Sequence, residues 1–198
     1  VTGLDITRPL DTGTIGALDA AIAEHAVLIF ERTGLDEEGL HRFARSFGEL
    51  DIGFKRVSRA PTRFKYDETL DMSNVGVDGA VVPPDHRKIV GNIANQLWHT
   101  DSSFKKVPAN ASHLSGREVP PIGGETEFAD VRAAYDSWPG SVSGITQEEL
   151  EGLICQHWIV FSRTLIVGDI FTEEDKKRLE PVRQALIRTH PATGRKVF

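Results

Sequence analysis

Apolar residues follow two different periodicities in the first fifty residues of the chain. In 12–22 and again in 40–47 they lie three and four positions apart, which is the spacing of one face of an α-helix. Asp11 precedes the first stretch as a helix-capping residue, and Gly48 ends the second. Between them, the continuous apolar run 26–30 is typical of a short buried strand. The chain therefore opens as a mixture of helix and strand.

From residue 72 onward the pattern predicts strands with helices inserted between them. Short runs of strand-forming residues, bounded by Pro and Gly, predict strands at 72–75, 89–93, 97–104, 113–119, 125–128, 157–163 and 182–188. Helices are predicted at 131–138, after the capping-box pair Thr146 and Glu149, and after Thr172 with Asp175. The Thr193–Gly194 turn predicts a final hairpin. Because strands and helices do not alternate as βαβ units, the predicted fold class is mainly β and antiparallel, with helical insertions.

Residues 51–88 show little periodicity, which in a segment of this length is typical of a functional lid or an irregular loop. Cations alternate there with aromatic rings, at Phe54, Lys55, Arg56, Arg59, Arg63, Phe64, Lys65 and Tyr66. Three interpretations stay open: a solvated charged loop, a lid over an anionic aromatic substrate, or a nucleic-acid patch.

Composition narrows the class of protein. The chain has 198 residues, of which 39% are hydrophobic and 26% charged, so it is long enough and apolar enough for a globular core. A lone Cys155 excludes an internal disulfide framework and a Cys-rich zinc site, and favours a cytoplasmic location. The net charge of −6 argues against a nucleic-acid partner. No apolar run is long enough for a membrane span, and no signal segment is expected at the start.

His99 and Asp101 form the clearest candidate for chemistry. They lie two apart, so on the predicted strand 97–104 both side chains would leave the same face. An imidazole and a carboxylate side by side are two thirds of the facial triad that holds Fe(II) with open coordination positions. The tripeptide alone is weak evidence, because about half an occurrence is expected by chance in a chain of this composition.

Two longer segments around and after this pair resemble one known family. Trp98–Phe104 and Gly124–Tyr135 are similar to the Fe(II)/2-oxoglutarate dioxygenases of the taurine and 2,4-dichlorophenoxyacetate dioxygenase family. The second segment is more similar to the phenoxyalkanoate branch than to the taurine branch. The resemblance continues through Arg188–Pro191 and back to Val1–Asp5, so it covers most of the chain.

The resemblance implies a fold, a cosubstrate and a set of ligands. The family fold is a double-stranded β-helix, or jelly roll, and residues 1–198 would form one dioxygenase domain of this type. His99 and Asp101 would be iron ligands, and the Thr126 hydroxyl would donate to a carboxylate of 2-oxoglutarate. The enzyme would use Fe(II), 2-oxoglutarate and O₂ to hydroxylate a small anionic substrate, with release of succinate and CO₂. In a phenoxyalkanoate, hydroxylation beside the ether oxygen gives a hemiacetal that collapses to a phenol.

Other polar residues have both a functional and a structural interpretation. Asn95 either lines the substrate pocket or ends a strand. His157, on the same predicted strand as Arg163, either meets a substrate carboxylate or has a structural role, and Arg163 shares these alternatives. For Thr126 the alternative to the cosubstrate contact is an ordinary strand residue.

The chain departs from the family pattern in one respect. The family has a third ligand, a second His, and about ten residues further an Arg that binds 2-oxoglutarate through a bidentate fork. Neither is found here, since His190 and Arg195 have the wrong spacing and context. We therefore expect the 198 residues to be an incomplete record of a longer protein, lacking the C-terminal part of the β-helix, and to be inactive if they were the whole of it.

The sequence is also compatible with other functions. Within the same chemistry the substrate could be taurine, another alkyl sulfonate or a sulfate ester. From a different class, the chain could be a non-catalytic jelly-roll binding module that has lost its metal. A nucleic-acid demethylase is disfavoured by the acidic balance. The sequence leaves the substrate, its preferred enantiomer and a homo-oligomeric state open.

Overall fold

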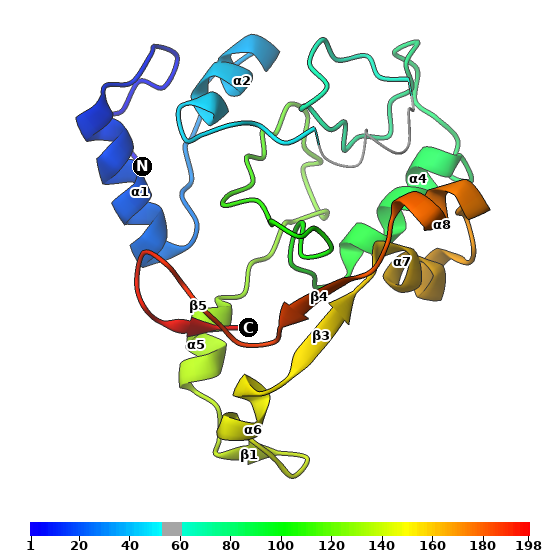
Figure 1. Cartoon of the computed structure of the whole chain (residues 1–198). Coiled ribbons are helices and arrows are strands. Elements are labelled where there is room, and N and C mark those ends of the chain that lie inside the picture. The colour runs from blue at the N-terminus through cyan, green and yellow to red at the C-terminus, as the bar shows by residue number, and fades with distance from the viewer. Residues whose placement is uncertain (53–60) are drawn as a thin grey trace. The chain divides into compact units, whose positions relative to one another are not determined.

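The computed structural model describes residues 1–52 and 61–198 (Figure 1). These residues form two compact units, each assembled from separate stretches of chain. Unit 1 comprises Val1–Gly48, His113–Cys155 and Ala185–Phe198, and unit 2 comprises Glu49–Ser112 and Gln156–Gln184. No helix in the described part of the chain has the length and apolar character that a membrane crossing requires.

Unit 1 contains the helices that the sequence predicts near the start and the middle of the chain: α1 (Thr12–His25), α2 (Glu37–Arg45), α5 (Val131–Asp136) and α6 (Gln147–Glu151). Side-chain caps explain where they begin. The Asp11 carboxylate accepts from the Thr14 amide at 2.8 Å, and Thr146 and Glu149 form the predicted capping box. The predictions of these helices are confirmed, although α2 begins three residues before the predicted stretch.

Two short hairpins complete unit 1. The strands β1 (Ser141–Val142) and β2 (Ile145–Thr146) pair antiparallel, and so do β5 (Arg188–Thr189) and β6 (Lys196–Val197). The second hairpin confirms the predicted turn at Thr193–Gly194, where Gly194 has a φ of 70° that favours glycine.

Buried apolar side chains stabilise unit 1 in two clusters. The first contains Ile6, Leu18 and Phe43, and Phe43 meets the rings of Phe30 and Phe47 edge to face, at centroid distances of 5.4 and 5.3 Å. The second contains Tyr135, Leu150 and Ile187. Contacts of this kind bury apolar surface and are the main source of stability in a globular unit.

A buried cation also contributes to unit 1. Arg132, only 4% exposed, donates from Nε and Nη2 to both carboxylate oxygens of Asp130, each at 2.9 Å. Its Nη1 donates to the carbonyl oxygen of Ala23 in the last turn of α1. The guanidinium therefore joins the start of α5 to the end of α1, and its charge is matched by Asp130.

Unit 2 contains the helices α4 (Arg87–Ile93), α7 (Ile159–Val167) and α8 (Glu173–Arg178), and the short 3₁₀ helix η1 (Ala94–Gln96). The capping box of Thr172 and Asp175 at the start of α8 is confirmed. Both α4 and η1 pack against α7. The strands β3 (Ile154–His157) and β4 (Val182–Ala185), of which Ile154, Cys155 and Ala185 are counted in unit 1, form a further two-stranded sheet.

Several predicted strands are wrong. Residues 89–93 lie in α4 and most of 157–163 in α7, because a short apolar run does not distinguish a buried helix from a strand. The segments 26–30, 97–104, 113–119 and 125–128 contain no strand, and the strand predicted at 72–75 is reduced to a single bridge between Val75 and Val81. A strand needs a hydrogen-bonded neighbour, which propensity alone does not supply. Helix therefore exceeds strand in the described residues, contrary to the mainly β prediction.

Candidate metal centre

His99 and Asp101 lie close together in the segment that follows η1. The Nε2 atom of His99 is 3.5 Å from Oδ1 of Asp101, and both side chains are accessible, with 48% and 63% of their surface exposed. The chain turns after His99 instead of continuing as a strand. The predicted proximity is thus confirmed, while the predicted same-face strand geometry is wrong.

A backbone contact fixes which nitrogen of His99 is available. The Nδ1 atom lies 2.6 Å from the carbonyl oxygen of Leu97, which can only accept a hydrogen bond. The proton of a neutral imidazole therefore sits on Nδ1, and Nε2 presents a lone pair toward Asp101. A metal-binding histidine is typically oriented by such a contact.

Asp101 is oriented in a similar way. Its Oδ2 atom accepts a hydrogen bond of 2.7 Å from the hydroxyl of Ser112, while Oδ1 faces His99. Each of the two side chains therefore presents one atom toward the other, an imidazole nitrogen from His99 and a carboxylate oxygen from Asp101.

The segment 101–112, which we call the ligand loop, is closed by its own contacts. The Ser102 hydroxyl accepts from the Ala109 amide at 2.7 Å, and Ser102 has a φ of 53°, an uncommon left-handed conformation for a residue other than glycine. Gln184 donates to the Lys105 carbonyl at 2.8 Å, and the Lys105 ammonium pairs with Asp51. These anchors hold the loop without help from the ligand pair.

The spacing of the two donor atoms fits a shared ion. Two ligand atoms each about 2.1 Å from one metal ion, and about 90° apart, lie about 3 Å from one another. The observed 3.5 Å needs only a small adjustment. In residues 1–52 and 61–198 no group of three or more His, Cys, Asp or Glu side chains is arranged to hold a metal, so His99 and Asp101 stand as two candidate ligands.

The other predicted site residues fall in different surroundings. Thr126 belongs to unit 1, where its side chain is exposed on a segment without a strand, so its contact with 2-oxoglutarate stays a prediction. Before it, Gly123 and Gly124 have φ values of 80° and 75°, in the region that favours glycine. His157 ends β3 half-buried and Arg163 lies in α7, so the prediction that they share one strand is wrong.

Asn95 and Arg163 are brought together. From α7, Arg163 donates through Nη2 to the Asn95 amide oxygen and through Nη1 to the Gly91 carbonyl oxygen, both at 2.5 Å. Burial lowers the pKa of Arg163. Both acceptors are neutral, and within the described part of the chain no carboxylate forms an ion pair with this guanidinium.

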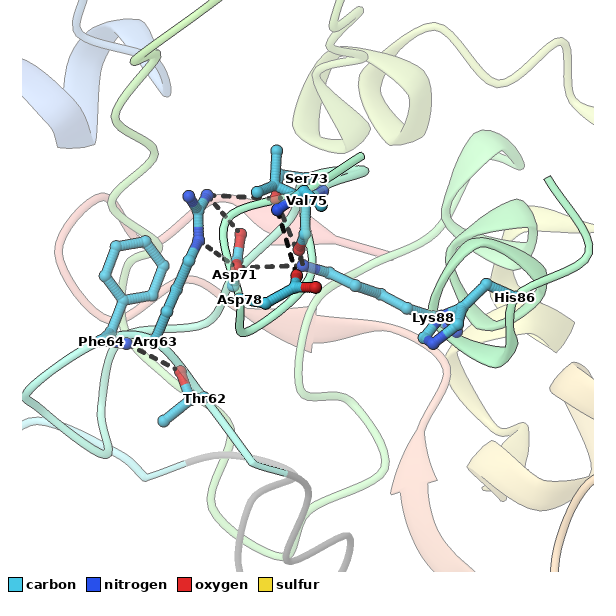
Figure 2. Close-up of polar contacts among 10 residues, drawn as sticks. Thr62, Arg63, Phe64, Asp71, Ser73, Val75, Asp78, His86 and Lys88 are labelled. Atoms are coloured by element: carbon cyan, nitrogen blue, oxygen red, sulfur yellow. Dashed lines mark hydrogen bonds and ion pairs between the residues drawn. The ribbon is translucent and has the colours of Figure 1, made fainter. Parts of the chain in front are cut away.

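Unit 2 also contains an ion cluster that no sequence pattern predicted, shown in Figure 2. Asp71 accepts from Arg63 Nε at 2.8 Å and from Lys88 Nζ at 3.0 Å, and Lys88 also donates to the Ser73 hydroxyl and the Val75 carbonyl oxygen. Burial alone would raise the pKa of Asp71, but these hydrogen bonds outweigh it and lower the pKa to about 2.

The cluster bears on the interpretation of the charged segment 51–88. Arg63 also lies over the ring of Phe64, and Lys65 over the ring of Tyr66, so these cations contact their own neighbours. Phe54, Lys55, Arg56 and Arg59, on which the lid interpretation also depends, lie outside the described residues. The partners of Asp71 are 8 and 17 positions away in the sequence, which no local pattern reveals.

Comparisons with known proteins agree on one family. The family model described as "Taurine catabolism dioxygenase TauD, TfdA family" matches residues 1–198. The chain is 43% identical to an alpha-ketoglutarate-dependent 2,4-dichlorophenoxyacetate dioxygenase of Cupriavidus pinatubonensis, over 99% of this chain and 67% of that protein. It is 29% identical to an (S)-phenoxypropionate/alpha-ketoglutarate-dioxygenase of Delftia acidovorans, over 98% of this chain and 64% of that protein.

A solved structure gives the same result. The crystal structure of AAD-2 in complex with Mn(II) and N-oxalylglycine superposes on all of this chain and on 68% of its own chain, with a TM-score of 0.87 and 36% sequence identity. The chain thus spans about two thirds of the length of the proteins that it matches.

Proposed function

The chain belongs to the taurine catabolism dioxygenase TauD, TfdA family, and from this premise we propose that the protein is an Fe(II)- and 2-oxoglutarate-dependent dioxygenase acting on a phenoxyalkanoate. The observation that carries the proposal is the facing pair of donor atoms, His99 Nε2 and Asp101 Oδ1. The 43% identity to a 2,4-dichlorophenoxyacetate dioxygenase supports the substrate class. The fold proposed for the whole protein is the jelly roll, and 1–198 is part of that single domain.

His99 and Asp101 hold the metal in this proposal. Nitrogen and oxygen donors of this kind suit Fe(II), and a third ligand comes from outside the described residues. Bound iron supplies the oxidising chemistry, in which O₂ and 2-oxoglutarate give succinate, CO₂ and a hydroxylated substrate. The protein positions the reactants, while the metal and cosubstrate carry out the difficult step. Thr126 donates its hydroxyl to a carboxylate of 2-oxoglutarate.

Asn95 and Arg163 border the substrate in this proposal. Arg163 is half-buried and bound to neutral acceptors, so it retains a charge that suits the carboxylate of a phenoxyalkanoate. It also fixes the Asn95 amide oxygen, and the contact of the amide nitrogen among the described residues is a weak one to Met72 Sδ at 3.9 Å. In this proposal the amide nitrogen donates to the ligand instead. Half-buried His157 is the second candidate for the carboxylate.

We also propose a cytoplasmic location and small-molecule partners. A lone cysteine suits a reducing cytoplasm, and the net charge of −6 suits a small anionic substrate bound at a local cation better than a nucleic acid. The partners are therefore a small anionic substrate, 2-oxoglutarate and O₂.

Succinate release by the whole protein tests the proposal. We expect release that depends on Fe(II), 2-oxoglutarate and a phenoxyacetate, with weaker release for alkyl sulfonates and sulfate esters. His99→Ala and Asp101→Ala should each lower the rate by more than about 100-fold, because altering residues that merely orient metal ligands already costs about 10- to 100-fold. The exposed His25→Ala and Asp85→Asn are matched controls and should leave the rate unchanged. Undiminished turnover in either ligand variant would reject the proposal.

A further inference from the structure

The hydroxyl of Ser112 contacts the one carboxylate oxygen of the metal pair that does not face His99. Ser112 Oγ donates to Asp101 Oδ2 at 2.7 Å, while Oδ1 lies 3.5 Å from His99 Nε2. We propose that Ser112 is a positioning residue that makes Asp101 bind the metal through Oδ1 alone. The inference rests on the proposed function, because it presupposes a metal at His99 and Asp101.

Binding through one oxygen matters for this chemistry. A carboxylate can coordinate an ion with one oxygen or with both. A facial triad works because it leaves several coordination positions for cosubstrate and O₂, and a second oxygen from Asp101 would take one of them. A hydrogen bond of normal length to Oδ2 holds that oxygen away from the ion.

The chemical nature of the donor fits this role. A hydroxyl is neutral, so it orients the carboxylate without cancelling the negative charge that attracts the metal. The ligand loop contains two lysines: Lys105 is paired with Asp51, and in the described residues neither Lys105 nor Lys106 forms an ion pair with Asp101. Asp101 thus has an uncharged hydrogen-bond donor at one oxygen and the candidate metal position at the other.

The contact contributes little to stability, which separates its role from that of an ordinary structural hydrogen bond. Asp101 is 63% exposed and Ser112 is also exposed, so water replaces the lost partner when the hydroxyl is removed. The ligand loop keeps its other hydrogen bonds, which the Ala109 amide donates to the Ser102 hydroxyl and the Gln184 side chain donates to the Lys105 carbonyl. A variant without the hydroxyl should therefore fold and still hold the loop.

Co(II) binding to the whole metal-free protein, with 2-oxoglutarate present, tests the inference without depending on turnover. The titration is followed by calorimetry and by the visible spectrum of Co(II), which reports its coordination. Ser112→Ala should weaken Co(II) binding about tenfold and change the spectrum, as expected when a ligand loses its orienting partner. Ser112→Thr keeps the hydroxyl and should restore both.

The control is Ser137→Ala, which removes an exposed hydroxyl from unit 1 whose contact is a long one of 3.4 Å to the Ala134 carbonyl. It should match the wild type in affinity and spectrum. If wild-type protein binds Co(II) and Ser112→Ala binds it with the same affinity and spectrum, the Ser112 assignment is wrong while the proposed function stands. If wild-type protein binds no Co(II), the proposed function fails and the assignment falls with it.

Discussion

The two compact units are stabilised in different ways. Unit 1 has two clusters of buried apolar side chains, around Phe43 and around Tyr135. In unit 2 the buried apolar residues, among those that the structure describes, are Ala94 and Val160. Its most prominent contacts are polar instead, between Asp71 and Lys88, Arg163 and Asn95, and within the ligand loop.

The two kinds of contact differ in how strictly they fix the positions of the groups involved. Apolar burial is non-directional and tolerates small displacements, whereas a hydrogen bond weakens steeply when its angle or distance changes. The candidate metal ligands lie in the unit that depends on directional contacts. We therefore expect core substitutions in unit 1 to affect mainly stability, and polar substitutions in unit 2 to affect mainly the site.

The largest expected effect comes from Phe43, which is 7% exposed at the centre of the first cluster. Phe43→Ala should lower the free energy of unfolding by about 3 kcal/mol, because it leaves a cavity among Ile6, Leu18 and the neighbouring rings. The matched change in unit 2 is Phe161→Ala on α7, where the ring is 60% exposed. It should cost less than about 0.5 kcal/mol. Urea unfolding of both variants makes the measurement, and equal losses would remove the contrast between the units.

A second effect, of about 2 kcal/mol, is expected from the titration of Asp71. The pKa of this carboxyl is about 2 in the folded protein, below its ordinary value of 3.8, and its side chain is 14% exposed. A lowered pKa means that the stabilisation is fully present above about pH 4 and is lost as the pH falls through about 2. Between pH 5 and 2 the wild type should lose about 2 kcal/mol more than Asp71→Asn.

Asp130 in unit 1 can be compared with Asp71, because its pKa is lowered in the same direction. Its pKa is also lowered to about 2, chiefly by the hydrogen bonds from Arg132, but its side chain is 36% exposed. Solvent screening should therefore make its contribution smaller than that of Asp71.

If Asp71→Asn has the same pH dependence as the wild type, the ion cluster of Figure 2 does not stabilise unit 2.

The smallest expected effect should be the same in both units. Thr146→Ala at α6 and Thr172→Ala at α8 each remove one side of a reciprocal capping box. Each should cost about 1 kcal/mol, because a cap satisfies amides of its own helix and does not depend on the packing around it. Ser at either position should retain most of the stability. Thermal melts measure the loss of stability in each Ala variant. A loss several-fold larger in one variant than in the other would show that the caps depend on the unit in which they lie.

Features encoded by neighbouring residues are the part of the fold that the sequence predicts. The caps at Asp11, Thr146 and Thr172 and the turn at Gly194 depend on contacts within a few positions, so their residue types are sufficient to identify them. Several strand predictions were wrong because a strand forms only when another segment of the chain pairs with it. The run 89–93 contains three strand-forming residues, Ile89, Val90 and Ile93, yet it forms the end of α4.

In the candidate site, too, contacts between neighbouring residues could be predicted from the sequence, while contacts between distant residues could not. His99 and Asp101 are close because they lie only two positions apart in the sequence, and this holds although the strand geometry assumed for them is wrong. Ser112 lies 11 positions from Asp101, and Arg163 lies 68 positions from Asn95. Such partners are set by the tertiary fold, and a serine or an asparagine carries no local pattern that identifies its contact.

The most direct test of the account is the stoichiometry and affinity of Fe(II) binding, measured anaerobically on the whole protein with 2-oxoglutarate present. His99 and Asp101 as ligands predict one ion per chain in the wild type, and affinity lowered by more than about 100-fold in His99→Ala and in Asp101→Ala. Binding of Fe(II) by both variants with wild-type affinity would contradict the assignment of the metal to this pair.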